Sequence, residues 1–241
     1  MRISSLTDVG MSREMNQDYL YTSEDAVGLL DNLFIIADGM GGHNAGEYAS
    51  RKAIEMIVSS IRKYSGPETD AIVLLRNAIK TANDFIRKKA SGDLMYHGMG
   101  TTVVAAVISD GKLITANVGD SRLYLVNDSI HQITQDHSLV QEMVRLGELT
   151  EEEAVNHPDK NIITRAVGAA EEIEVDFFEA DVKQGDYILL CSDGLSNMVN
   201  NATIHEVLTG EGSVADKTEK LLSLANRYGG KDNITLIVIE V

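Results

Sequence analysis

The sequence predicts an α+β fold, because its strand-like and helical stretches occur in separate groups along the chain. Seven short apolar runs have the length and composition of core strands: residues 33–37, 102–108, 113–118, 122–126, 173–178, 187–191 and 234–239. Two stretches with helical spacing lie between the first and the second of these runs, and turn residues link the runs that follow. This order is typical of antiparallel sheets with separate helices, and it differs from the regular alternation of a parallel βαβ sheet.

Turn residues set the expected order of the central strands. Asp110-Gly111 separates two apolar runs and has the composition of a tight hairpin turn. Gly119-Asp120 separates the next pair in the same way. We therefore expect residues 102–133 to form an antiparallel meander.

Three helices are predicted from apolar residues that recur every three or four positions. The first stripe is Ala49, Ala53, Ile57 and Ile61; the second is Leu75, Ile79, Ala82 and Ile86; the third is Val214, Thr218, Leu221, Ala225 and Tyr228. Residues 136–168 contain few large apolar side chains. Thr150 and Glu153 have the spacing of a capping box that opens a short helix, and Pro158 closes it. We expect one domain over residues 1–241, with a surface flap at 136–168.

The composition restricts the class of function. The 241 residues carry 21 Lys and Arg against 37 Asp and Glu, a net charge of −16, which disfavours binding to nucleic acid and to anionic membranes. No apolar run approaches the roughly 20 residues of a membrane helix, and nothing near Met1 resembles a secretion signal. The single Cys191 excludes an internal disulfide and multi-cysteine zinc sites. We expect a cytoplasmic monomer.

Four aspartates lie at the ends of predicted core strands: Asp38, Asp120, Asp193 and Asp232. Glycine is adjacent to three of them, and glycine allows the backbone to approach an ion or ligand closely. If these strand ends share one edge, the carboxylates repel one another unless a cation neutralises them. Oxygen ligands without histidine or thiolate favour Mg²⁺ or Mn²⁺. Each Asp-Gly pair taken alone is equally typical of a turn.

The glycine-rich segment that begins at Asp38 does not fit a nucleotide-binding loop. A dinucleotide fingerprint that starts at Gly39 would need glycine where Asn44 stands. A P-loop that ends at Gly46 would need Lys and Ser or Thr, where the chain has Glu47 and Tyr48.

Eight motifs in order resemble the type 2C metal-dependent protein serine/threonine phosphatases, in their compact bacterial form. They are residues 10–18 (GMSREMNQD), 38–43 (DGMGGH), 100–102 (GTT), 118–122 (VGDSR), 136–138 (DHS), 164–168 (TRAVG), 191–194 (CSDG) and 230–235 (GKDNIT). The resemblance spans nearly the whole chain. It implies a four-layer α-β-β-α sandwich, with two central antiparallel sheets flanked by helices and a two-metal site at one edge.

The resemblance also implies a role for each site residue. Asp38 would bridge two Mn²⁺ or Mg²⁺ ions, the Gly39 carbonyl would bind one, and Asp193 and Asp232 would hold the other. Asp120 with Asp193 matches the position of a third, weaker ion, and Asp18 would support metal-bound waters. Arg13 would bind the substrate phosphate. The implied reaction is hydrolysis of phosphoserine and phosphothreonine by a hydroxide on the two metals, reversing bacterial Ser/Thr kinase signalling, with phosphoproteins and a cognate kinase as partners.

Elementary chemistry agrees with these roles. Two adjacent metal ions lower the pKa of a shared water and stabilise a transferring phosphoryl group. Direct attack by hydroxide requires no phosphoenzyme, which fits the absence of a reactive-cysteine motif. Arginine makes a planar two-point contact to phosphate that lysine does not reproduce.

Two positions depart from the animal members of the family. Met40 stands where those members have a histidine assigned as general acid, so the leaving-group proton must come from a metal-bound water, our hypothesis, or from another group such as His43. Gln17 replaces a glutamate near metal-bound water. Two other functions stay open at this point: a phosphoprotein-binding relative without activity, which loss of a metal carboxylate would favour, and a metal-dependent nuclease or phosphodiesterase, which the net charge opposes.

Overall fold

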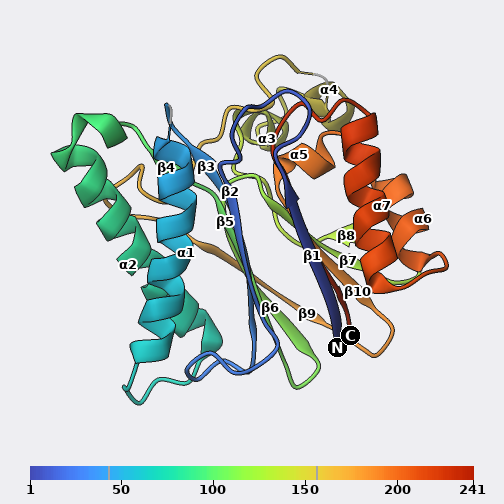
Figure 1. Ribbon diagram of the computed structural model, residues 1–241, viewed down its shortest axis with the longest axis horizontal. Coiled ribbons are helices and arrows are strands. Elements are labelled where there is room, and N and C mark those ends of the chain that lie inside the picture. The colour runs from blue at the N-terminus through green and yellow to red at the C-terminus, as the bar shows by residue number, and fades with distance from the viewer. Residues whose placement is uncertain (43, 156) are drawn as a thin grey trace.

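Two antiparallel sheets form the centre of the protein, and helices cover their outer faces (Figure 1). The computed structural model describes residues 1–42, 44–155 and 157–241. One sheet, here the β11 sheet, has the order β1 (Arg2–Asp8), β11 (Ile234–Glu240), β10 (Tyr187–Cys191), β7 (Arg122–Val126) and β8 (Ile130–Gln132). The other, the β3 sheet, has the order β2 (Asp18–Ser23), β3 (Leu33–Met40), β5 (Val103–Ser109), β6 (Lys112–Val118) and β9 (Asp176–Asp181), and β4 (Gly100–Thr101) pairs with β3.

The helices confirm the predicted α+β sandwich. On the β3 sheet lie α1 (Ala45–Lys63) and α2 (Ala71–Gly92), which the first two apolar stripes predict. On the β11 sheet lie α5 (Asp193–Ser196), α6 (Asn201–Thr209) and α7 (Val214–Arg227), of which the sequence predicts α7 alone. A short 3-10 helix, η1 (Leu94–Tyr96), follows α2. No helix within the described ranges is long and apolar enough to span a bilayer.

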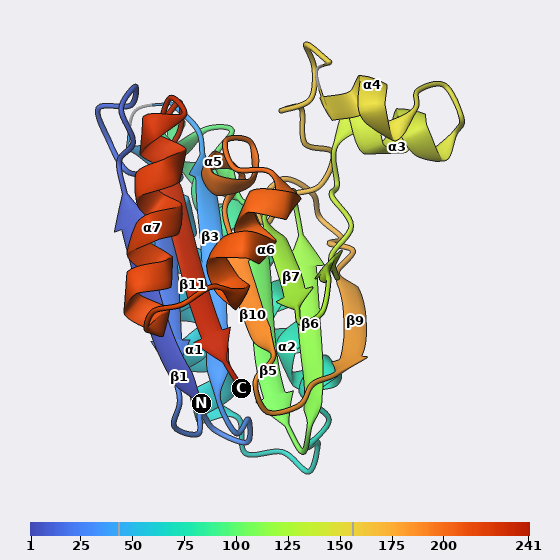
Figure 2. The ribbon, with the colours of Figure 1, turned by 90° about the vertical axis from the view of Figure 1, so that its right-hand side faces the viewer.

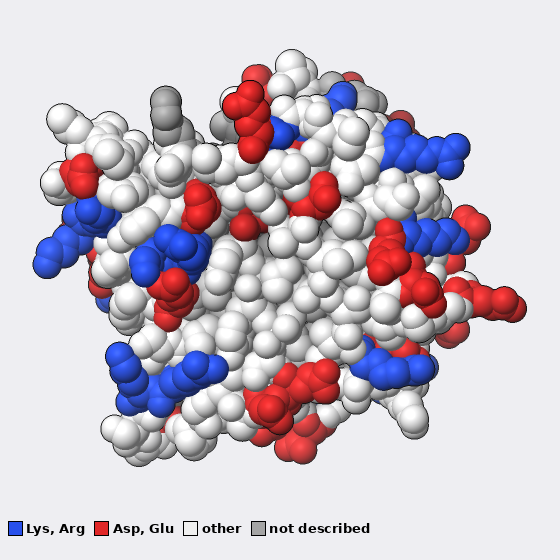
Figure 3. All heavy atoms as spheres, viewed as in Figure 1, with Lys and Arg blue, Asp and Glu red and all other residues white. Residues whose placement is uncertain are grey.

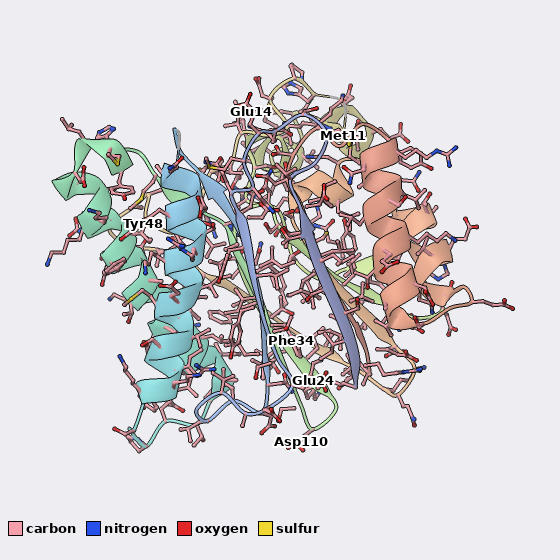
Figure 4. All side chains as sticks on the ribbon, viewed as in Figure 1. Met11, Glu14, Glu24, Phe34, Tyr48 and Asp110 are labelled. Carbon is pink, nitrogen blue, oxygen red and sulfur yellow. The ribbon has the colours of Figure 1, made fainter. Side chains whose placement is uncertain are left out.

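The alternation along β3 shows how the layers are held together. Leu33, Ile35 and Ala37 pack against α1 and α2, whereas Phe34 and Ile36 pack into the interface between the sheets. Phe34 is seen between the two sheets in Figure 4. Both faces of this strand are therefore buried, which explains its continuous apolar sequence.

The predicted meander is wrong at Gly119-Asp120. β5 and β6 form the expected hairpin, in which Ser109 faces Lys112 across Asp110-Gly111. After β6, however, the chain crosses to the other sheet, where β7 pairs with β10 and β8. Gly119 has φ +107°, and a Cβ atom there would lie 2.6 Å from the Thr102 side chain, so the crossing requires glycine. β9 also begins three residues later than the apolar run that predicted it.

Residues 136–168 contain α3 (Leu139–Arg145) and α4 (Glu151–Val155), which project from one end of the sandwich (Figure 2). The capping box is confirmed: the Thr150 amide donates to Glu153 Oε2 at 2.9 Å, and the Glu153 amide donates to Thr150 Oγ1 at 3.3 Å. A backbone bridge from Ser138 to Ile163 joins the two ends of this flap, and a bridge from Val167 to Thr101 of β4 connects the flap to the body of the protein.

Candidate active site

Most of the sequence-predicted site residues line one cavity, which has a volume of about 290 Å³. Its lining includes Arg13, Asp38, Gly39, Asp120, Asp193 and Asp232. The residue 9–17 loop, whose Met11 and Glu14 are labelled in Figure 4, lies at this end of the sandwich, and Glu24 and Asp110 lie at the opposite end. The predicted strand ends therefore do share one edge, although they come from two different sheets.

The β3 sheet contributes Asp38 and Asp18, which face each other in register across β2 and β3. The backbone of Asp38 is fixed on both sides: its amide donates to Thr102 Oγ1 at 2.9 Å, and its carbonyl accepts from Thr101 Oγ1 at 2.8 Å. Asp18 does not line the cavity and is only 5% exposed. Ser192 Oγ donates to Asp18 Oδ2 at 2.8 Å, so Asp18 connects the two sheets.

The β11 sheet contributes Asp193 and Asp232. Because β10 and β11 are antiparallel, the end of β10 and the start of β11 lie at the same edge. Asp193 opens α5 directly after β10, and its Oδ2 accepts from Asn197 Nδ2 at 2.9 Å. Asp232 precedes β11; its Oδ1 accepts from the Asn233 amide at 2.9 Å and its Oδ2 from Arg13 Nη2 at 2.8 Å.

Close packing behind the cavity explains the glycine that follows Asp38. A Cβ atom on Gly39 would lie 2.0 Å from the carbonyl oxygen of Gly46, at the start of α1. Only glycine therefore lets α1 approach the end of β3 this closely, and the approach leaves Gly39 in the cavity wall.

Burial first, and then repulsion between neighbouring carboxylates, raises the pKa values of Asp18, Asp38, Asp120 and Asp193 above the usual range. Burial raises the pKa of Asp18 to about 7, of Asp120 to about 8 and of Asp193 to about 6, and neighbouring aspartates add to each rise. For Asp38 the pKa lies well above its ordinary value, through burial and then repulsion from Asp18, Asp193, Asp120 and Asp232. The site therefore has a strong excess of negative potential, which a cation would relieve.

The donor set fits hard divalent cations. Asp18 Oδ1 and Asp193 Oδ1 are buried and have no hydrogen-bond partner, as expected for oxygens suited to an ion or its waters. In the part of the chain that is described, no three acidic, histidine or cysteine side chains are already grouped as a closed ligand set. Several of the carboxylates are instead held by neighbours, such as Asp232 by Arg13, so an ion would have to draw them together.

Two flap residues complete the wall of the cavity, and a third connects the flap to the body of the protein. Asn161 and Ile163 line it from the flap, which no sequence signal indicated. His137 connects the flap to the crossover turn: its Nδ1 accepts from the Gly119 amide at 3.1 Å, and its Nε2 lies 3.0 Å from Asp176 Oδ2.

The structure also places two residues that the sequence analysis considered outside the metal site. Arg122 pairs with Asp136, as the sequence allowed. Cys191 is buried as expected. His43, the alternative proton donor, lies outside the described residues.

Comparison with known proteins agrees with this geometry. Residues 11–235 match the family model for protein phosphatase 2C. Protein phosphatase PhpP of Streptococcus pneumoniae is 41% identical over 100% of this chain and 98% of its own length. The S. agalactiae serine/threonine phosphatase structure is 43% identical, with a TM-score of 0.92 and coverage of 100% and 99%.

A second solved structure, the catalytic domain of the serine/threonine protein phosphatase PstP in complex with two manganese ions, is 35% identical with a TM-score of 0.85. The match covers 99% of this chain and 97% of that domain. With its two-sheet sandwich and its acidic cavity, this chain belongs to the protein phosphatase 2C family and is a protein serine/threonine phosphatase.

Proposed function

We propose that this phosphatase hydrolyses phosphoserine and phosphothreonine in a single step, by direct attack of a hydroxide held by two Mn²⁺ or Mg²⁺ ions. The observation that carries the proposal is the convergence of Asp38, Asp193 and Asp232 from two sheets on one cavity beside Arg13. When bound, such ions lower the pKa of a water and neutralise charge on the transferring phosphoryl group. The manganese-bound PstP domain supports the choice of metal.

Within this proposal the ligands divide between the sheets. Asp38 and the Gly39 carbonyl hold ions from the β3 sheet, and Asp193 and Asp232 hold them from the β11 sheet. Asp120 and Asp193 provide a third, weaker site. Asp18, buried behind Asp38 with one unpartnered oxygen, accepts hydrogen bonds from waters of the metal site.

The chain's own groups bind and orient the substrate. Arg13 is half-exposed beside the cavity and supplies a planar two-point contact to phosphate oxygens. Met40 lines the cavity but has no exchangeable proton, so it does not protonate the leaving alkoxide. We propose that a water of the site supplies this proton. In a chain with net charge −16, Arg13 and the metal ions provide the attraction for a phosphate dianion.

In the cell we propose that the protein acts as a cytoplasmic monomer on phosphoproteins, including a cognate Ser/Thr kinase, and so reverses kinase signalling. The family membership and the acidic surface support this setting: exposed Asp and Glu side chains outnumber basic ones around much of the face in Figure 3. That surface disfavours nucleic acid as a substrate.

The decisive experiment measures inorganic phosphate released from a phosphothreonine peptide while Mn²⁺ is titrated, with EDTA as the blank. Asp38→Ala and Asp193→Ala should each eliminate release, whereas Glu24→Ala, an exposed acid at the opposite end, should leave it unchanged. Folded wild-type protein that binds Mn²⁺ but releases no phosphate would instead indicate a phosphoprotein-binding function. Cleavage of a single-stranded oligonucleotide in parallel reactions would indicate the nuclease alternative.

A further inference from the structure

A groove with a volume of about 1090 Å³ lies between α2 and residues 171–175, and it shares no lining residue with the active-site cavity. One wall is a single face of α2, in which residues recur at intervals of three and four. Four of these are basic: Arg76, Lys80, Arg87 and Lys88. Basic side chains are visible over α2 on the left of Figure 3. The half-buried side chains of Ile173 and Val175 supply apolar surface on the other side.

The basic residues of this groove outnumber its acidic residues by four to three and form few ion pairs. Among the described residues, no carboxylate lies within ion-pair distance of Arg76, Lys80 or Lys88. Arg87 has one exposed partner, Glu171, at 3.5 Å. With Asp84 and Glu172 included, the lining has a net charge of +1 on a chain of net charge −16. The groove is thus a locally basic site on an acidic surface.

The dimensions of the groove fit an extended peptide. From Arg76 to Gly92 the helix rises about 24 Å, at about 1.5 Å per residue. An extended chain covers that length with about seven residues, at about 3.4 Å each. Alternate side chains of such a segment would point toward the basic wall and toward the Ile173 and Val175 surface.

Both walls of the groove continue along the chain to the active site. After Gly92, α2 leads through η1 to β4, which pairs with Gly39 and Met40 in the cavity wall. The opposite wall, residues 171–175, comes shortly after the flap in the sequence, and the flap residue Val167 forms a backbone bridge with Thr101 of β4. Buried Asn83 fixes the two walls together, since its side chain accepts from the Gly168 amide at 2.7 Å and donates to the Ala170 carbonyl at 3.0 Å. The walls of the groove are therefore fixed to each other and are connected through the backbone to the wall of the active-site cavity.

We propose that this groove is a docking site for an acidic, extended segment of the substrate phosphoprotein, whose aliphatic side chains contact Ile173 and Val175. The inference rests on the phosphatase function above and adds a second recognition element to it. The acidic side chains of the docked segment pair with Arg76, Lys80 and Lys88, while the phosphorylated residue of the same substrate enters the active-site cavity. Docking of this kind lowers KM by raising the effective concentration of the phosphosite and leaves kcat unchanged.

The first test is independent of catalysis. Binding of a fluorescein-labelled peptide, Glu-Glu-Leu-Glu-Glu-Leu-Glu, is followed by fluorescence polarisation in EDTA. The double variant Arg76→Glu/Lys80→Glu should weaken binding about tenfold, or about 1.4 kcal/mol. The matched variant Lys183→Glu/Lys220→Glu changes the net charge equally at exposed positions elsewhere and should not weaken it. Equal loss in both variants, no binding to wild type, or binding unaffected by NaCl would overturn the proposal.

The second test concerns the role in substrate selection. The same acidic segment is joined through a flexible Gly/Ser linker to a phosphothreonine peptide, and steady-state phosphate release is measured with saturating Mn²⁺. The extension should lower KM for wild type and for Lys183→Glu/Lys220→Glu, and should have no effect for Arg76→Glu/Lys80→Glu. Release from a small aryl phosphate should be equal in all three proteins. Binding in the first test without a KM effect at any linker length would refute substrate docking, whereas loss of all turnover would refute the catalytic proposal alone.

Discussion

Arg13 Nη2 lies 2.8 Å from Oδ2 of Asp232, so the proposed phosphate anchor is held by a proposed metal ligand. Asp232 raises the pKa of Arg13 through this hydrogen bond and through its charge. An ion that takes the Asp232 carboxylate would release the guanidinium toward the cavity. We therefore expect metal binding and phosphate binding to be coupled through this ion pair.

The first prediction follows from this pair. Arg13→Ala should raise KM for a phosphothreonine peptide by about tenfold or more, because a charge-assisted two-point contact contributes about 1.5–3 kcal/mol. The same variant should bind Mn²⁺ more tightly in titration calorimetry, because Asp232 no longer has to leave Arg13. Arg227→Ala, on the exposed end of α7, is the control. Unchanged or weaker Mn²⁺ binding in Arg13→Ala would contradict the coupling.

Removal of one carboxylate should stabilise the metal-free protein. Asp193→Asn keeps an oxygen that accepts from Asn197 and eliminates repulsion from Asp232. We expect Tm in EDTA to rise by several degrees, corresponding to about 1–2 kcal/mol, while turnover is lost. Asp110→Asn removes an equal charge at the exposed hairpin and should change neither quantity. A lower Tm in Asp193→Asn would show that the carboxylates do not repel one another in the folded state.

Stability should also depend on pH in the metal-free protein. The folded-state pKa values of Asp193, Asp18 and Asp120, about 6, 7 and 8, exceed the ordinary value of 3.8. The folded protein therefore binds more protons than the unfolded chain in this range, and its stability falls as the pH rises. The contribution is complete below about pH 4 and is lost progressively as the pH rises through the folded-state values of about 6, 7 and 8.

Urea unfolding in EDTA between pH 5 and pH 8 measures this effect. Saturating Mn²⁺ should flatten the profile, since bound ions keep the carboxylates ionised throughout. Asp193→Asn should also reduce the slope. A stability that rises with pH in EDTA would be inconsistent with the site described above.

His137 should act as a positioning residue for the flap and for Asp120. His137→Phe leaves the Gly119 amide without its acceptor and removes the contact to Asp176, which keeps its ion pair with Arg165, at a cost of about 1–3 kcal/mol. We expect weaker Mn²⁺ binding in the site that includes Asp120, together with a higher KM for peptides. His205→Phe removes a half-buried histidine bonded to the Asn127 carbonyl, so it loses comparable stability without these changes. Equal Mn²⁺ affinity in the two variants would restrict His137 to a structural role.

The sequence predicts the acidic edge of the site well, because its residues follow or precede strongly apolar strands. The run 187–191 coincides with β10, and Asp193 lies where that run places it. β1, by contrast, has the sequence RISSLTD and lies at the sheet edge, where polar side chains face solvent, so it lacks a strong apolar signal. Asp18 was found through family resemblance alone, since β2 is similarly weak.

Other features depend on contacts that local patterns do not encode. A Gly-Asp pair is equally suited to a hairpin and to a crossover between sheets, and the choice at Gly119 depends on whether β7 pairs with β6 or with β10. Asn161 and Ile163 reach the cavity because the flap folds back through the Ser138–Ile163 bridge. The basic face of α2 is visible in the sequence, but the segment that opposes it lies about 90 residues later.

Asp18 and Asp38 belong to one sheet, whereas Asp193 and Asp232 belong to the other, and Ser192 joins Asp18 across the interface. A cation bound by ligands from both sheets would link the two halves of the sandwich. The metal affinity of the site would then depend on the relative position of the two sheets. A displacement of one sheet relative to the other would separate the ligands while each sheet stayed intact. Packing changes at Phe34 or Ile237, buried deep in the interface, would thus be transmitted to metal affinity without any contact with the ion.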